Sequence, residues 1–261
     1  MKILFIGGNH PRHLYYINKV ARDYPLAGAV IQKREHMIPE PPQNTPKKYK
    51  DLWHRHFEGR DAAEYKYFGD QFYPDVDNLI EVTGDNLESN QVVQFVNSLR
   101  PDIVLIFGCG MIRGELARVL PEMTINLHLG LSPRYRGAAT LFWPFYFLEP
   151  QWAGCTFHKI VHEPDAGDIL HQCRPVLKKG DGIHDVACKA VIHAAGEIRR
   201  LLYAYPDWKF KKQTATGKNF LASDFKAHHL SAIYEVFDND IVDHYLDEKI
   251  EGREPKLWKS V

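Results

Sequence analysis

Cysteine is scarce in this sequence, and neither sign of charge is in excess. Only 4 of the 261 residues are cysteine and none forms a Cys-x-x-Cys pair, so we expect reduced thiols, no disulfide framework and no cysteine-based metal site. Lys plus Arg and Asp plus Glu each total 33. Proteins that bind polymeric nucleic acid usually have a basic excess. The balance therefore disfavours nucleic acid as a partner.

The sequence also has no long apolar run. The apolar stretch near the N-terminus, Ile3 to Ile6, is shorter than the core of a signal peptide. The longest stretch, Ile103 to Ile112, contains two glycines and is too short to span a membrane. We therefore expect a cytoplasmic protein without a membrane partner. Hydrophobic residues at 44% and aromatic residues at 12% are enough to form a sizeable core.

Strand-like and helical patterns alternate through the first 205 residues. The chain opens with a strand at residues 2–6, a helix from Pro11 to about Tyr24 and a strand at 26–32, which favours a parallel sheet with right-handed crossovers. Further strands are expected at 79–82, 102–107, 125–129, 154–161 and 168–176, and further helices at 47–68, 87–99 and 184–205. These patterns predict an α/β fold with a doubly wound, mainly parallel sheet.

The composition shifts after residue 205. A strand-like stretch at 208–213, a turn at Gly217 and a helix with Asp224 as its N-cap follow. We therefore predict a catalytic domain at 1–205 and a small α+β appendage at 206–261.

A glycine-rich loop follows the strand at 102–107. Its pattern, from Gly108 to Gly114, is Gly-x-Gly-x-x-x-Gly, one residue longer than a dinucleotide fingerprint, and it comes late in the chain. This disfavours NAD. Ligands of open α/β sheets nevertheless bind at such loops, at the carboxyl ends of central strands.

Asn126-Leu127-His128 is the strongest chemical signal. Residues i and i+2 of a strand face the same side, so the amide and the imidazole are expected to share one pocket. Alone, such a pair is more often a structural polar contact. It is followed, however, by the loop Leu131–Gly137 with its two arginines, by Gly154–His158, and by the Asp-x-Gly of Asp165 to Gly167.

Together these segments resemble the formyltransferase family that uses N10-formyltetrahydrofolate, over roughly residues 1 to 205. The resemblance implies a Rossmann-like formyltransferase fold with Asn126, His128 and Asp165 as catalytic residues and N10-formyltetrahydrofolate as co-substrate. It implies no metal and no covalent intermediate. It also implies a folate-binding set, in which Asp168 is a ligand or a structural residue: Phe107, Gly108, Gly110, Met111, Ile112, His162 and Asp168.

The chemistry of formyl transfer fits these residue types. An amine attacks the formyl carbon, and the carbonyl oxygen becomes negative. Asn126 and a protonated His128 can donate hydrogen bonds to that oxygen. Asp165 can accept the amine proton, directly or through water, and can keep His128 charged.

Within the family, the sequence is most like the enzymes that formylate nucleotide-linked amino sugars. We expect a homodimer that acts on a GDP- or dTDP-linked 4-amino-4,6-dideoxy sugar destined for surface polysaccharide. Formylation of glycinamide ribonucleotide or methionyl-tRNA is an alternative, and so is a folate- or nucleotide-binding regulator without turnover. The candidate substrate-binding residues combine forked cations, histidines and an aromatic ring: Asn9, His10, Arg12, His13, Arg134, Arg136 and Trp143.

Overall fold

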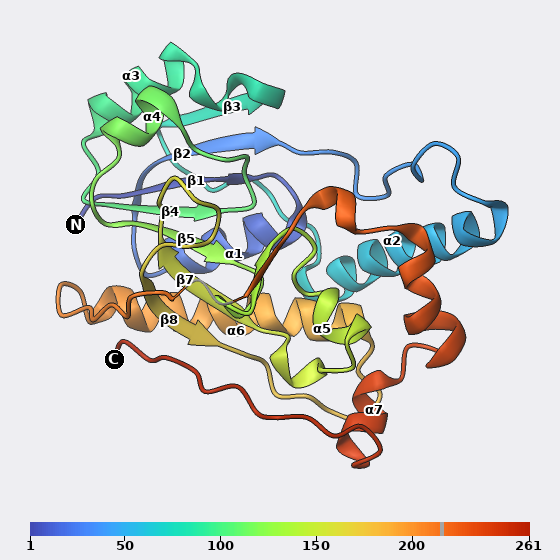
Figure 1. Ribbon diagram of the computed structural model, residues 1–261. Coiled ribbons are helices and arrows are strands. Elements are labelled where there is room, and N and C mark those ends of the chain that lie inside the picture. The colour runs from blue at the N-terminus through green and yellow to red at the C-terminus, as the bar shows by residue number, and fades with distance from the viewer. Residues whose placement is uncertain (215–216) are drawn as a thin grey trace.

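A seven-stranded sheet forms the centre of the molecule (Figure 1), with the strand order β3-β2-β1-β4-β5-β7-β8. The computed structural model describes residues 1–214 and 217–261. The strands are β1 (Ile3–Gly8), β2 (Leu26–Lys33), β3 (Leu79–Thr83), β4 (Ile103–Phe107), β5 (Thr124–His128), β7 (Cys155–Lys159) and β8 (Ile169–Cys173). Strands β1 to β5 are parallel, whereas β7 and β8 are antiparallel to their neighbours. The prediction of a mainly parallel sheet is confirmed.

Helices cover both faces of this sheet. The helices α1 (Pro11–Ala21), α2 (Lys47–Phe68) and α6 (Ile183–Tyr203) contribute to one core, and α3 (Asn90–Leu99) and α4 (Gly114–Val119) to the other. Residues alternate between the two cores along β1, where Ile3 and Phe5 face the first and Leu4 and Ile6 the second. This arrangement confirms the doubly wound architecture.

The order of the strands places a crevice beside β1. The chain moves outward from β1 through β2 to β3, then returns to β4 on the other side of β1 and continues to β5. The loops after β1 and β4 therefore diverge at the carboxyl edge of the sheet. Such a switch point is where open α/β sheets bind ligands.

The C-terminal segment packs on the end of α2 and on the loop after β5. The short strand β6 (Tyr135–Gly137) pairs in parallel with β9 (Lys218–Phe220), and a third core joins α2, α5 (Trp143–Tyr146), the start of α6 and α7 (Ile241–Leu246). The last residues run beside β8, where the backbone N–H of Gln172 donates to the carbonyl of Trp258 at 2.8 Å. The division at residue 205 stays a prediction.

Two elements predicted for this segment are wrong. Residues 208–213 form no strand, only a single bridge between Lys211 and Ile169, because the buried Trp208 indole donates to the carbonyl of Leu201 and ties the segment to α6. No helix begins at Asp224. The 3₁₀ turns Ala222–Asp224 and Ala227–His229 and the π turn Ala232–Val236 replace it. The predicted turn at Gly217 borders residues 215 and 216, which lie outside the described residues.

Packing explains the missing helix. The ring of Phe225, between the two 3₁₀ turns, lies 4.8 Å from that of Phe142 and 5.5 Å from that of Trp53. Burying this ring fixes the backbone in short turns and overrides the local capping signal. Among the described residues, no helix combines the length and the apolarity that crossing a membrane requires.

Candidate active site

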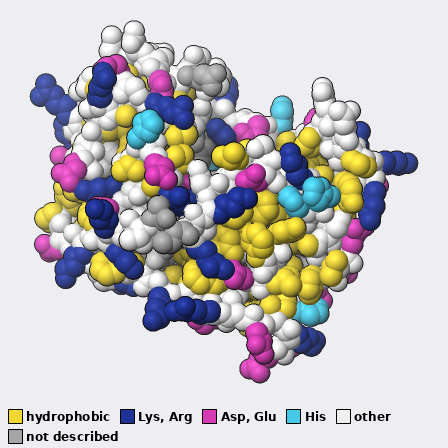
Figure 2. All heavy atoms as spheres, viewed as in Figure 1, with side chains coloured by type: hydrophobic (Ala, Val, Ile, Leu, Met, Phe, Trp, Pro, Cys, Tyr) yellow, Lys and Arg dark blue, Asp and Glu magenta, His cyan; other side chains and the backbone are white. Residues whose placement is uncertain are grey.

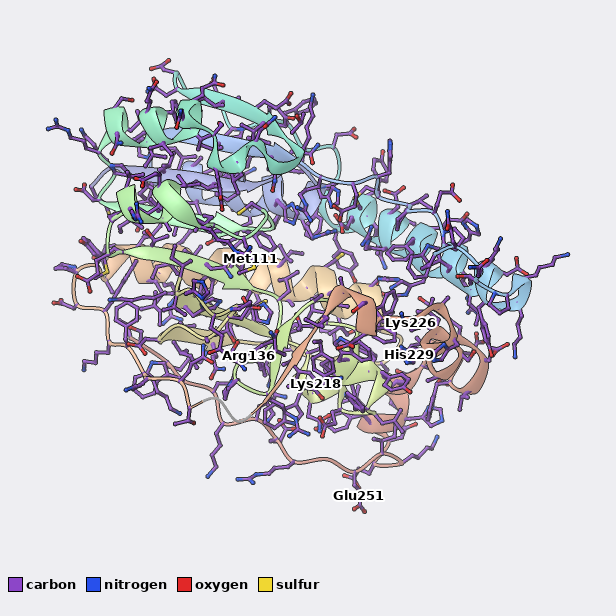
Figure 3. The ribbon with its side chains drawn as sticks, turned by 45° about the horizontal axis from the view of Figure 1, so that its top comes forward. Met111, Arg136, Lys218, Lys226, His229 and Glu251 are labelled. Carbon is purple, nitrogen blue, oxygen red and sulfur yellow. The ribbon has the colours of Figure 1, made fainter. Side chains whose placement is uncertain are left out.

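A cavity of about 940 Å³ opens at the carboxyl ends of β1, β4 and β5. Its walls come from the loop after β4, from β5 and β7, from one face of α2 and from the C-terminal segment. In Figure 3, Met111 marks the loop after β4, and Lys218, Lys226 and His229 mark the C-terminal segment. The cavity therefore lies at the switch point of the sheet, where the sequence predicted a ligand.

Asn126, His128 and Asp165 converge in this cavity. Asn126 and His128 project from β5, and Asp165 from the loop between β7 and β8. The Asn126 Nδ2 atom is 3.5 Å from Asp165 Oδ1, and the His128 Nδ1 atom is 3.3 Å from Asp165 Oδ2. The structure thus brings together all three predicted catalytic residues. Their roles in catalysis stay a prediction.

The proton on His128 can be placed from its contacts. Its Nε2 is 2.9 Å from the carbonyl of Tyr135, which can only accept, so Nε2 carries a hydrogen. Its Nδ1 faces the carboxylate, and a hydrogen bond there requires a second hydrogen. Burial lowers the pKa of His128, and the charge of Asp165 opposes this. Burial alone would raise the pKa of Asp165. The neighbouring His128 and His158 outweigh this effect and hold the pKa of Asp165 well below its usual value.

His158 is a fourth polar member of the site, which the sequence analysis did not assign. It lies opposite Asn126 in the β5–β7 register, its Nδ1 donates to the carbonyl of Lys159 at 2.8 Å, and its Nε2 accepts from Asn126 Nδ2 at 3.1 Å. Its Nε2 is also 3.3 Å from Asp165 Oδ1. The signal available in the sequence was the alternation Thr156-x-His158, which mirrors Asn126-x-His128.

The loop that carries Asp165 is held by the backbone. Gly137 N–H donates to Asp165 Oδ2 at 2.9 Å, and Gln213 Nε2 donates to the Asp165 carbonyl at 2.9 Å. Asp165 has a φ of +51°, an uncommon conformation for a non-glycine residue. A Cβ atom on Gly167 would lie 1.8 Å from the carbonyl oxygen of Lys159, which explains the glycine of the Asp-x-Gly motif.

The predicted folate residues divide into two groups. Phe107, Gly108, Gly110, Met111 and Ile112 all line the cavity. His162 and Asp168 do not; His162 is exposed, and the carbonyl of Asp168 accepts from the backbone of Lys159.

Gly108 serves the packing of a histidine. Its φ is +72°, and a Cβ atom there would lie 2.1 Å from Nε2 of His13. The His13 ring also packs edge-on against Phe107 at 4.7 Å. Burial, reinforced by Arg12, holds the pKa of His13 well below its usual value, so its ring is neutral. The first glycine of the pattern after β4 is thus explained by the approach of α1.

The predicted substrate-binding residues also divide. His10, Arg12 and His13 line the cavity, and Asn9 lies behind them, where its Oδ1 accepts from the backbone of Arg34 at 2.8 Å. Arg134 turns outward, donates in bidentate fashion to Glu149 and stacks on Trp152 at 4.8 Å.

The other two candidates are buried outside the cavity wall. Arg136 pairs with Glu163 at 3.1 Å, and its position is visible in Figure 3. Trp143 stacks on Phe220 at 4.6 Å and donates to the carbonyl of Ala138, so it belongs to the third core. Among the described residues no cluster of His, Cys, Asp and Glu has an arrangement suited to a metal ion.

Fold and site together define a doubly wound α/β protein with an amide, an imidazole and a carboxylate gathered in a switch-point cavity. A family model described as formyl transferase matches residues 54–195, more than half of the chain. The chain belongs to the formyl transferase family.

One curated relative and two solved structures illustrate the likeness. Over 89 residues, the chain is 34% identical to the methionyl-tRNA formyltransferase of Thermotoga maritima, an alignment that covers 34% of this chain and 28% of that protein. A sugar N-formyltransferase from a Shewanella species superposes with a TM-score of 0.53 at 19% identity, covering 86% of this chain and 78% of that one.

The second structure is the formyltransferase PseJ from Anoxybacillus kamchatkensis in complex with UDP-4,6-dideoxy-4-formamido-L-AltNAc and tetrahydrofolate. It superposes with a TM-score of 0.51 at 14% identity, covering 92% of this chain and 96% of that one. Likeness at these identities establishes the fold.

Proposed function

We propose that this protein transfers the formyl group of N10-formyltetrahydrofolate to the amine of a nucleotide-linked 4-amino-4,6-dideoxy sugar, GDP- or dTDP-linked, for a surface polysaccharide. The observation that carries the proposal is the convergence of Asn126, His128 and Asp165 in one cavity of a formyl transferase family member. The cytoplasmic location and the homodimer remain part of this proposal.

The loop after β4 fits a flat, largely apolar ring system. Ile106, Met111, Ile112, Ile160 and Val161 line this end of the cavity. Met111 and Val161 are 44% and 52% exposed, so apolar surface faces water at this end of the cavity. A pterin stacked here would cover them and remove apolar surface from water.

The chain's own residues account for the proton and charge movements of formyl transfer. In the proposed step His128 donates to the carbonyl oxygen as it becomes negative through Nδ1, the ring nitrogen that the carbonyl of Tyr135 does not hold. This donation requires the protonated ring, which burial opposes and the charge of Asp165 favours. One hydrogen of the Asn126 amide is directed to His158, while the 3.5 Å contact with Asp165 is weak enough for the other to turn toward that oxygen. Asp165, ionised because its pKa is lowered, can accept the amine proton.

The wall opposite the loop after β4 has side chains suited to an acceptor with flat and anionic parts. Trp53, Phe57 and Phe225 contribute aromatic surface, and Arg60 contributes a cation. A nucleotide-linked sugar has both features. PseJ, which shares the fold, was solved with such a ligand. The arginines Arg134 and Arg136, which we expected to hold the diphosphate, are engaged by Glu149 and Glu163 instead.

The experiment is a transfer assay with the purified chain. N10-formyltetrahydrofolate is combined in turn with GDP-, dTDP- and UDP-linked 4-amino-4,6-dideoxy sugars, glycinamide ribonucleotide and methionyl-tRNA, and tetrahydrofolate release is recorded. We expect release with a nucleotide-linked sugar. Release with only one of the last two acceptors would overturn the sugar assignment and keep formyl transfer. Folate binding without release for any acceptor would favour a regulator.

Oligomeric state is tested separately by light scattering. Figure 2 shows hydrophobic side chains gathered on the face over α5 and the C-terminal segment. Phe147, which follows α5, and Leu221 are 48% and 57% exposed. Apolar surface of this kind is often covered by a subunit contact. A monomeric mass at all micromolar protein concentrations would contradict the proposed homodimer.

A further inference from the structure

One face of α2 lines the cavity, and it mixes aromatic with charged side chains. Trp53, Phe57, Arg60, Glu64 and Phe68 recur at spacings of three and four residues, which places them on one side of the helix, and all five belong to the cavity wall. A helix that packs only on a core presents an apolar stripe. Charges in the middle of this stripe therefore need a partner inside the cavity.

Two of the three arginines on the cavity wall have a carboxylate partner. Arg12 pairs with Glu64, which is buried, and also donates to Nδ1 of His10 at 3.0 Å. Arg34 lies 3.2 Å from a carboxylate oxygen of Glu35. Their charges are largely neutralised within the protein.

Arg60 differs from both. Among the described side chains no carboxylate lies within ion-pair distance of it, and its guanidinium donates a hydrogen bond to the carbonyl of Met37. Its Nε atom is buried and has no acceptor among the described residues. Its guanidinium stacks on the ring of Phe57 at 4.6 Å, which leaves the donor-bearing edge of the plane facing other groups.

The surroundings of Arg60 make an anion favourable. Burial and the charge of Arg12 lower the pKa of Arg60 to about 10 against the more distant carboxylates of Glu64, Glu35 and Asp61, so it stays protonated at neutral pH. A partly buried cation without a direct ion-pair partner is costly, and an anionic oxygen group in the cavity would reduce that cost while accepting the free Nε–H.

We propose that Arg60 binds an anionic oxygen group of the acceptor, a phosphate or a carboxylate, and that α2 is therefore the helix that selects the acceptor. This inference rests on the proposed function and deepens it, because it assigns the anion to a residue outside the sequence-predicted set. The aromatic side chains Trp53 and Phe57 flank the same stretch of wall and would contact the uncharged part of that acceptor.

The test is calorimetry without folate. Wild type, Arg60→Gln, Arg60→Lys and the matched control Arg55→Gln are titrated with GDP, dTDP, UDP, pyrophosphate and glucuronate. Arg55 lies on the same helix, exposed, and pairs with the exposed Asp238, so its replacement removes a cation without reaching the cavity. Thermal melts accompany each variant to verify folding.

We expect at least one anion to bind wild type and Arg55→Gln equally, Arg60→Lys about 3-fold to 10-fold more weakly, and Arg60→Gln at least 10-fold more weakly. Dependence on Arg60 for the diphosphates would identify phosphate as the group, and dependence for glucuronate alone would identify a carboxylate. If Arg60→Gln does not fold, Arg60→Lys decides. Equal affinity of wild type and the folded Arg60 variants, or binding of none of the five by wild type, overturns the proposal.

These outcomes separate the two levels of inference. Arg60-dependent anion binding without tetrahydrofolate release from any nucleotide-linked sugar would remove the proposed function and keep the subsite. Turnover of such a sugar with an unchanged KM in the Arg60→Gln variant would keep the proposed function and remove the subsite.

Discussion

His128 lies between a carbonyl and a carboxylate: its Nε2 is 2.9 Å from the carbonyl of Tyr135, and its Nδ1 is 3.3 Å from Oδ2 of Asp165. Tyr135 belongs to β6, so the small sheet with β9 fixes one side of the imidazole, while the loop after β7 fixes the other. The ring therefore cannot satisfy both neighbours in its neutral form. Burial lowers the pKa of His128, and the charge of Asp165 opposes this, so the contact favours the protonated form.

Replacing either member of this pair should abolish most of the activity. We expect Asp165→Asn and His128→Ala each to lower kcat by about 100-fold or more, the scale of lost proton transfer or oxyanion donation. Folate affinity should change much less, since the pair contacts the reacting atoms. Single-turnover kinetics and folate titration measure both quantities, and a near-wild-type kcat in either variant would remove that residue from the catalytic set.

His158 should act through Asn126. Its Nε2 accepts one amide hydrogen and so sets the orientation of the amide. We expect His158→Phe to lower kcat by roughly 10-fold with little effect on the KM for folate, because a misdirected donor loses part of its stabilisation of the oxyanion. His158→Gln, which retains an acceptor, should lose less. Equal losses in both variants would argue against an orienting role.

Gly108 should tolerate no side chain. A Cβ atom there meets the His13 ring at 2.1 Å, and the φ of +72° disfavours other residues. We expect Gly108→Ala to lower the free energy of unfolding by roughly 2 kcal/mol or more. Gly196, in the exposed part of α6 with no atom near its Cβ position, is the control; Gly196→Ala should stabilise by about 0.5–1 kcal/mol. Urea denaturation of both variants measures the two changes in the free energy of unfolding. Changes of the same sign would contradict this explanation of Gly108.

Stability should fall as the pH is lowered from about 6.5 to about 4. Burial, reinforced by Arg12 for His10 and by Lys259 for His171, lowers the pKa of each to about 4. In that window the unfolded chain binds more protons than the folded one, so the free energy of unfolding decreases as protons are added.

The loss should reach at least about 1 kcal/mol between pH 7 and pH 4.5, measured by urea denaturation. His10→Gln should flatten this dependence, whereas the exposed His36→Gln should leave it unchanged. A free energy of unfolding that stays constant over the window would contradict the neutral, buried state of these histidines.

Local patterns in the sequence determined the strands of the main sheet, the main helices and the shared face of Asn126 and His128, whereas Asp165 was assigned through the family resemblance. The alternation in β5 alone put Asn126 and His128 on one side, because side chains of a strand alternate between its faces. The apolar runs of β1 and β4 and the helical repeats between them defined the doubly wound class. These features depend on spacing along the chain, so a single sequence carries them.

Only the tertiary structure decided which charged and aromatic residues face the cavity. Arg134 and Arg136 stand in the same loop as equally plausible ligands, yet each is neutralised by a glutamate distant in sequence, and Trp143 is taken into the third core by Phe220. Arg60 lines the cavity, although no motif near it in the sequence indicates a binding residue. Burial and ion pairing are set by partners that lie far away along the chain, and the spacing of residues does not encode them.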